Sequence, residues 1–393
     1  MRGKTPSEAQ PDRLAGDSSC RALDLVHAAG RITLKIGSSL LVDAGKGGVR
    51  QAWLRALAED IAELRKEGRK VVVVSSGAVA LGRRRLSLKH SMRLALKQAA
   101  AAAGQPRLMQ AWENACSAWG MESAQLLLTL DDTESRRRWL NARATIEVLL
   151  AQGALPIINE NDTVATEELR YGDNDRLSAR VAQMIRSDLL ILLSDVDGVY
   201  TGDPAHDPLA RHVPRIGTIT PEVEAWAAGA SRTGIGSGGM RTKLTAARVA
   251  QGFGCATIIM AGHEKSPLRR LAKGSARATI IEAAGTPARA YKQWIAGTLV
   301  PAGSITIDKG AERALVAGKS LLPAGATAID GEFERGVCLR VLDHEGRELA
   351  RGITAYTAAE MRLICGRSSS EIGLRLGYRG PDELIHRNDL VLI

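Results

Sequence analysis

The sequence predicts an α/β protein, a three-layer sandwich with a mostly parallel sheet, followed by a small C-terminal β-barrel. From Arg31 onward, continuous apolar runs alternate with longer amphipathic stretches. Strands buried on both faces are such runs, and the helices between them cover both faces of a parallel sheet. After about Gly297 the segments become short and are broken by glycines and charged turns, which is typical of a small barrel.

Hydrophobic periodicity assigns the individual elements. The expected strands of the sheet are Ile32–Ile36, Val71–Val74, Leu155–Ile158, Leu189–Leu193 and Thr257–Met260. The expected helices between them are Trp53–Glu67, Arg93–Ala103, Arg138–Gln152, Ser178–Arg186 and Met240–Gly252. The expected segments of the barrel are Ser304–Asp308, Gly336–Leu342, Glu348–Ile353 and Leu390–Ile393.

Three segments follow from this pattern. Residues 1–30 mix charged residues, serine and proline without an apolar run, so we expect a disordered N-terminal extension. Residues 31–297 form the larger α/β domain and residues 302–393 the small β domain. Pro301 and Gly303 mark the linker between them.

Composition excludes several classes of protein. No apolar run approaches the roughly 20 residues that a membrane helix needs, and the first thirty residues lack the apolar core of a signal peptide. The five cysteines are scattered without a C-x-x-C pair, which predicts free thiols in the reducing cytoplasm.

The net charge of +10 is unevenly distributed. Residues 302–393 carry 12 Lys and Arg against 13 Asp and Glu, so the basic excess lies in the larger domain. A cationic surface around a site for anionic substrates explains this excess at least as well as RNA binding does.

Polar residues and glycines follow the first two strands, where an open parallel sheet binds its ligands. Lys35 precedes a Gly-Ser turn, which places an ammonium group beside backbone N–H donors and suits a phosphate. Ser76 precedes Gly77, which permits a close backbone approach. A solvated loop lysine and a serine helix cap are the alternatives for these two positions.

An acidic and amide-rich cluster follows the third strand. It comprises Asn159–Thr163 and, a little later, Gly172–Asp175. Such groups bind the amino group of an amino acid and organise nearby lysines. The alternative is a solvated loop followed by the N-cap of a helix that begins near Asp175.

Two further segments suit a nucleotide. Ser194–Tyr200 ends the fourth strand with acidic residues, although its Asp-Gly sequence is also a plain turn former. Gly234–Lys243 presents glycines that lead into a helix with a lysine on its first turn, an arrangement that suits polyphosphate. Its glycines match the dinucleotide fingerprint only formally, because no strand precedes them and Ile259, twenty residues past Gly239, is not acidic.

In their order along the chain, these segments resemble the motif series of the amino acid kinase family, and the tail from about Ala302 resembles a PUA domain. The resemblance covers Arg31 to the C-terminus and implies the amino acid kinase fold plus a PUA-like barrel. The series consists of Lys35–Ser39, Ser75–Ala78, Asn159–Asp162, Gly172–Ala179, Ser194–Tyr200 and Gly238–Lys243.

The resemblance implies a role for each matching position. Lys35 and Lys243 resemble the lysines that contact the ATP phosphates, and Asp175 resembles the carboxylate that orients them. The positions that resemble substrate-binding residues are Ser76, Asp162, Asp173 and Asn174. The positions that resemble nucleotide-binding residues are Ser194, Asp195, Ser237, Gly238, Gly239, Met240, Arg241 and Thr242, together with the two lysines.

The implied activity is phosphorylation of the γ-carboxylate of L-glutamate by ATP, the first step of proline biosynthesis. ATP as co-substrate and Mg²⁺ are the implied cofactors, and no residue is assigned as a metal ligand. The family also implies a homo-oligomer, a dimer or tetramer, and feedback inhibition by proline. A membrane partner is not expected.

Two alternatives remain open. One is another member of the family, acting on aspartate, N-acetylglutamate, carbamate or UMP, which shares the glycine and lysine elements. The other is an RNA-binding protein whose PUA-like tail does the main work. The near-neutral charge of that tail, its few aromatic residues and its lack of a basic run argue against RNA binding.

Overall fold

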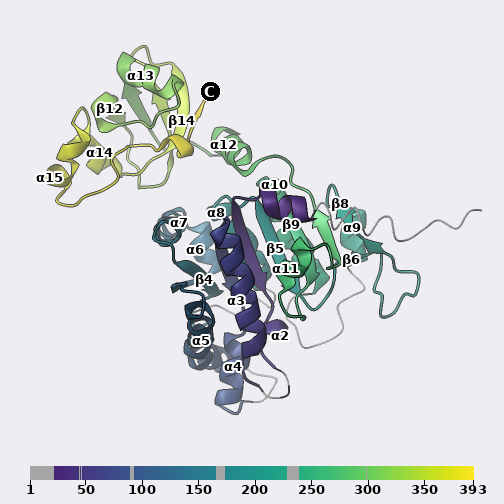
Figure 1. Ribbon diagram of the computed structural model, residues 1–393. Helices are drawn as coiled ribbons and strands as arrows, with labels where there is room; N and C mark the ends of the chain where they lie inside the picture. Colours follow the sequence, from purple (N-terminus) through teal and green to yellow (C-terminus); the bar gives the residue numbers. More distant parts are fainter. Residues whose placement is uncertain are drawn as a thin grey trace, which may run out of the picture. The chain divides into compact units, whose positions relative to one another are not determined.

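The chain folds into two compact units (Figure 1). The computed structural model describes residues 22–43, 45, 47–88, 93–164, 173–227, 239–297 and 299–393. The first unit comprises the chain up to Thr133 together with Ala142–Thr286, and the second comprises Glu134–Asn141 and Pro287–Ile393. Helix α12 (Pro287–Gly297) was expected in the larger domain but groups with the C-terminal unit, where the Tyr291 hydroxyl donates to Asp389 at 2.9 Å.

A mostly parallel sheet of eight strands forms the centre of the first unit, as expected. All five predicted strands are present. Neighbouring strands pair in parallel except β9 and β10, which are antiparallel. In pairing order the strands are β3 (Ser123–Leu128), β4 (Leu155–Glu160), β2 (Lys70–Ser75), β1 (Arg31–Ile36), β5 (Leu189–Ser194), β9 (Ala256–Ala261), β10 (Ala278–Ile281) and β8 (Arg215–Ile216). A short ribbon pairs β6 (Val199–Tyr200) with β7 (His212–Val213).

Helices cover both faces of this sheet, which gives the predicted three layers (Figure 1). Successive side chains of a strand point to opposite faces. On β5, accordingly, Ile191 packs in one hydrophobic core with α3 and α5, whereas Leu190 and Leu192 pack in the other with α8 and α10. The helices of this unit are α2 (Ser38–Leu41), α3 (Gln51–Lys66), α4 (Ala78–Arg85), α5 (Leu94–Ser117), α6 (Leu130–Glu134), α7 (Arg136–Ala151), α8 (Asp173–Met184), α9 (Pro221–Trp226), α10 (Met240–Gly252) and α11 (Pro267–Ala272). The last residue of α6 and the first part of α7 group with the second unit.

The predicted disordered extension is too long at its C-terminal end. Residues 22–28 are helical, and Ala22, Val26 and Ala29 are buried in the first hydrophobic core. These small apolar residues recur at the spacing of one helix face, which supplies the burial that ordered structure needs. Residues 1–21 lie outside the described part of the chain.

The second unit has its own sheet and its own core. Its five strands pair in the order β12 (Ala326–Asp330), β11 (Ser304–Ile307), β13 (Cys338–Leu342), β14 (Glu348–Ile353) and β15 (Leu390–Leu392). The helices that accompany them are α13 (Lys309–Val316), α14 (Ala358–Ile364) and α15 (Ile372–Leu376). The predicted barrel segments are thus strands, and closure of the sheet into a barrel stays a prediction. Among the described residues, no helix has both the length and the apolar character to span a bilayer.

Candidate active site

The site lies at one edge of the sheet, where four parallel strands end. Strands β4, β2, β1 and β5 are consecutive neighbours and run in the same direction, so their carboxyl ends meet. Lys35 is the penultimate residue of β1, Ser76 follows β2 and Ser194 ends β5. The topology alone therefore brings together polar residues that are far apart in the sequence.

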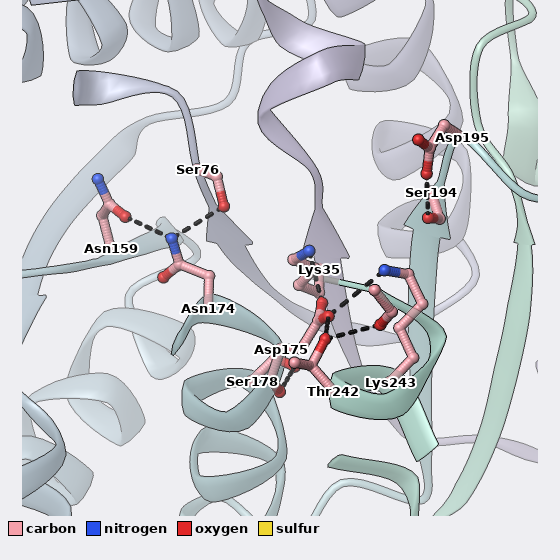
Figure 2. A network of polar contacts seen from close by, with 11 residues as sticks. Lys35, Ser76, Asn159, Asn174, Asp175, Ser178, Ser194, Asp195, Thr242 and Lys243 are labelled. Atoms are coloured by element: carbon pink, nitrogen blue, oxygen red, sulfur yellow. Dashed lines mark hydrogen bonds and ion pairs between the residues drawn. The ribbon is translucent and has the colours of Figure 1, made fainter. Parts of the chain in front are cut away.

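Lys35 and Lys243 converge on Asp175 (Figure 2). The Nζ atom of Lys35 lies 2.5 Å from one carboxylate oxygen of Asp175, and the Nζ atom of Lys243 lies 3.4 Å from the other. The Thr242 hydroxyl donates to the second oxygen at 2.7 Å. The expectation that the two ammonium groups meet at one place is confirmed.

Three different elements supply this cluster. Lys35 is held in the middle of the sheet because β1 pairs with β2 on one side and with β5 on the other. Asp175 lies in the first turn of α8, and its side chain is only 1% exposed. Lys243 lies in the first turn of α10, which packs on the same face of the sheet as α8. No local sequence pattern links these positions, and only the fold joins them.

Burial and charge act against each other in this cluster. Burial disfavours the ionised form of Asp175, but the charges of Lys35 and Lys243 outweigh burial and hold the pKa of the carboxyl below its usual range. Burial lowers the pKa of Lys243 most strongly, the charge of Asp175 opposes this effect, and the like charge of Lys35 adds to it. Two ammonium groups share the Asp175 carboxylate, an arrangement that suits the binding of an anion.

The N-terminus of α10 adds donors to this positive site. Gly239 is the N-cap residue, and among the described residues it has no side-chain capping hydrogen bond. The free N–H groups of a helix N-terminus favour a phosphate. Met240 is half-buried and Arg241 is exposed. Ser237 and Gly238, which were expected to bind the nucleotide, lie outside the described residues.

A second polar network lies beside the lysines, at the start of α8 and the ends of β2 and β4 (Figure 2). The Asn174 amide nitrogen donates to the Ser76 hydroxyl at 2.8 Å and to the Asn159 amide oxygen at 3.1 Å. The Asn159 amide nitrogen donates to the Gln105 amide oxygen at 2.8 Å. Because Asn174 directly precedes Asp175, this network adjoins the lysine cluster. It is an uncharged network of amides and a hydroxyl.

The remaining predicted residues are placed as follows. Asp162 lies in the turn after β4 and is half-buried. Asp173 is the first residue of α8, and its side chain lies outside the described part. At the end of β5, the Ser194 hydroxyl donates to Asp195 at 2.9 Å. The charge of Asp195 also acts on Lys243, which indicates that this segment belongs to the same site.

Sequence reasoning assigned no role to Gln105, and it did not single out Asn159 within its cluster as a site residue. Asn159 is the penultimate residue of a buried strand and is only 2% exposed, so its burial was the signal that could have marked it. Gln105 lies in the middle of α5, far from any strand end, and carries no local signal at all.

With this geometry established, comparison with known proteins defines the class. The model of the amino acid kinase family matches residues 30–260, and the PUA domain model matches residues 303–373. The chain belongs to the amino acid kinase family and carries a PUA domain in its C-terminal unit.

Several curated relatives carry the name glutamate 5-kinase. The glutamate 5-kinase of Caulobacter vibrioides is 56% identical over 369 residues, which cover 93% of this chain and 97% of the relative. The glutamate 5-kinase of Paramagnetospirillum magneticum is 54% identical and is covered over 98% of its length. That of Brucella ovis is 54% identical and is covered over 95%.

Proposed function

We propose that this chain transfers the γ-phosphoryl group of ATP to the γ-carboxylate of L-glutamate. This is the reaction for which its relatives are named. The observation that carries the proposal is the convergence of Lys35 and Lys243 on Asp175, beside the hydrogen-bonded side chains of Ser76 and Asn174. The lysines suit the phosphates, and the adjoining polar wall suits the amino acid. The product is glutamyl 5-phosphate, the first intermediate of proline biosynthesis.

The reaction needs positioning and charge neutralisation more than it needs covalent chemistry from the protein. The attacking γ-carboxylate is already ionised at neutral pH, because the ordinary pKa of a glutamate side chain is about 4.3. No general base is therefore required. Lys35 and Lys243 offset the negative charge of the transferring group, and Asp175 holds their two ammonium groups together.

The remaining site residues receive roles by position. Ser194 and Asp195 at the end of β5, with Gly239, Met240, Arg241 and Thr242 at the start of α10, would hold the nucleotide. Asp162, Asp173 and Asn174 would hold the amino acid, and Ser237 and Gly238 would complete the phosphate-binding turn.

ATP is expected to enter as its Mg²⁺ complex. Within the described residues, no group of three His, Cys, Asp or Glu side chains is arranged to hold a metal ion. Asp195, at the end of β5, is the carboxylate among the proposed nucleotide-binding residues. Mg²⁺ would supply further positive charge to the transferring group.

A coupled assay of ADP release across candidate acceptors tests the proposal. The panel contains L-glutamate, L-aspartate, N-acetyl-L-glutamate, carbamate and UMP, because the lysine cluster alone suits all of these reactions. We expect clear preference for glutamate. An acyl phosphate product reacts with hydroxylamine to give a hydroxamate, so a second readout identifies the phosphorylated group. Preference for aspartate or UMP would overturn the choice of substrate.

Three further properties belong to the proposal. The family implies a homo-oligomer, either a dimer or a tetramer, and light scattering tests this. It also implies inhibition by proline, which the ADP-release assay with added proline tests. A reducing cytoplasmic location agrees with the free thiols of Cys116, Cys255, Cys338 and Cys365. RNA binding by the PUA domain is a separate candidate, and filter binding of the whole chain at physiological salt tests it.

A further inference from the structure

The polar network beside the lysines has a fixed hydrogen-bond direction. The backbone N–H of Glu160 donates to the Asn159 amide oxygen at 2.9 Å. A backbone N–H is always a donor, so it fixes which end of the Asn159 amide is oxygen. The nitrogen end therefore points away from Asn174, as Figure 2 shows, and must find an acceptor, which is the Gln105 amide oxygen at 2.8 Å.

The direction set at Asn159 determines what Gln105 and Asn174 present. Gln105 gives its oxygen to Asn159, so its amide nitrogen is left, and this nitrogen is buried without a hydrogen-bond partner in the described residues. Asn174 gives its nitrogen to Asn159 and Ser76, so its oxygen is left, and this atom is also buried and unpartnered in the described residues. One end of the network thus offers a donor and the other an acceptor.

Close helix packing brings Gln105 to this position. A Cβ atom on Gly104 would lie 1.9 Å from the carbonyl oxygen of Ala78, so the backbone of α5 touches the start of α4 just after Ser76. The Trp112 indole, two turns along α5, donates to the Ser75 hydroxyl at 3.1 Å. Residues seven apart share a helix face, so these contacts hold Gln105 against the end of β2.

We propose that Gln105 binds the substrate: its amide nitrogen donates to the α-carboxylate of glutamate, and the Asn174 oxygen accepts from the α-ammonium group. The inference rests on the proposed function, because it assumes that an amino acid occupies this pocket. Buried polar groups without partners are uncommon in folded proteins, and a ligand with one anionic and one cationic group would satisfy both atoms. Glutamate carries these two groups on the same carbon atom.

Two substitutions test the role of Gln105. Gln105→Met keeps the length of the side chain and removes its polar atoms. Gln105→Glu keeps an oxygen that accepts from Asn159, but it replaces the donor that faces the ligand with a second oxygen. It therefore tests the same contact if Gln105→Met folds poorly. The matched control is Gln110→Met on the same helix, where Gln110 is exposed and bonds only to neighbouring α5 side chains among the contacts described.

We expect the KM for glutamate to rise at least about tenfold in Gln105→Met and further in Gln105→Glu, where two carboxylates would face each other. The KM for ATP should stay unchanged, as should both constants in the control. A merely structural role would move the constants of both substrates. Unchanged glutamate KM in a folded Gln105→Met variant would overturn the inference.

A substrate analogue locates the contact. 4-Aminobutyrate is glutamate without its α-carboxylate, so its binding should be equally weak in wild type and in Gln105→Met. An equal loss for both ligands would contradict the assigned contact.

Binding measured by calorimetry without ATP separates this inference from the proposed function. Wild-type chain that binds glutamate without phosphorylating it would contradict the function and leave the variant comparison intact. Wild-type chain that does not bind glutamate would contradict both.

Discussion

Asp175 has the most exacting position of any single residue in the site. Its two carboxylate oxygens face two different lysines and a hydroxyl, in a place where its side chain is 1% exposed. A buried carboxylate is stable there only because both positive charges are present. In the proposed reaction, the same carboxylate would keep the two like charges close enough to act on one phosphoryl group.

Replacement of Asp175 by asparagine should lower kcat by about a hundredfold or more, because the ammonium groups would repel each other and lose their common orientation. The measurement is the steady-state rate of ADP release at saturating substrates. Asp131→Asn is a suitable control, since Asp131 is an exposed residue at the start of α6. A folded Asp175→Asn enzyme with normal kcat would contradict the assigned role.

The pKa of Asp60 is raised, whereas that of Asp175 is lowered, and Asp60 lies outside the proposed site. It lies on α3, is 2% exposed, and accepts the backbone N–H groups of Leu268 and Arg269 at the start of α11. Burial raises the pKa of its carboxyl from 3.8 to about 6, although the two N–H groups and the Arg269 charge act in the opposite direction. The folded protein therefore holds the proton of Asp60 more strongly than the unfolded chain does.

This raised pKa predicts how stability depends on pH. The contribution of Asp60 is fully present below about pH 4 and is lost as the pH rises through about 6, which costs about 3 kcal/mol. Asp60→Asn should lack that part of the decline, while a control at the exposed Glu113, Glu113→Gln, should keep it. Urea unfolding at pH 4 to 7 measures the difference, and parallel curves for wild type and Asp60→Asn would disprove this explanation.

At the scale of elements, the sequence was most informative where strands are buried on both faces. All five apolar runs are strands, because a continuous run of branched residues suits a central parallel strand. β3 was missed because its residues alternate between partly buried and exposed positions and include Ser123 and Gln125. β10, which has only four residues and pairs antiparallel with β9, was also missed.

All five predicted helices are present, as α3, α5, α7, α8 and α10, whereas the shorter helices α2, α4, α6, α9 and α11 were not predicted. The helix predicted over Arg93–Ala103 extends to Ser117 and contains Pro106, because the burial of Leu108 and Trp112 outweighs the cost of a proline within a helix. Lys35 and Ser76 stand at the ends of β1 and β2, and Asn174 stands at the start of α8, so the sequence pattern singled out their positions, while their roles stay predictions. Gln105 could not be found in this way, because it reaches the site through a helix–helix contact that has no sequence signature.

That helix–helix contact depends on two glycines. A Cβ atom on Gly82 of α4 would lie 1.7 Å from the carbonyl oxygen of Ala100 on α5, and the neighbouring atom is backbone that no rotamer change can move. Gly82→Ala should therefore destabilise the fold by about 3 kcal/mol or more. Gly252→Ala in α10, where a Cβ atom would meet nothing within 4 Å, should be neutral or stabilising by up to about 1 kcal/mol. Thermal unfolding of both variants checks this, and equal melting temperatures would refute the close-packing argument.

At the scale of the whole molecule, the chain divides its tasks. All described residues of the proposed site lie in the first unit, and the C-terminal unit has a separate core that includes Leu339, Tyr356 and Met361. The sequence predicted two domains because the segments become shorter and richer in glycine and charged turns near Gly297. The division falls earlier, after Thr286. The difference arises because α12 carries a helical pattern like that of the larger domain, and periodicity does not reveal the unit with which a helix packs.

This division predicts that the catalytic unit acts without the C-terminal one. A chain that lacks residues 287–393 should keep its KM values within a few-fold, because every described site contact remains within the first unit. The assay is ADP release, with circular dichroism as the check on folding. A truncated chain that folds cooperatively but has no turnover would show that the C-terminal unit contributes to the chemistry.

The fixed direction of the amide network also bears on the handedness of the substrate. With the γ-carboxylate held near the lysines, the mirror image of glutamate would place its ammonium group against the Gln105 nitrogen and its α-carboxylate against the Asn174 oxygen. The first contact would place two hydrogen-bond donors against each other, and the second would place two acceptors against each other. If the proposed contacts hold, the backbone N–H of Glu160 would make substrate binding enantioselective, and D-glutamate should be turned over far more slowly than L-glutamate.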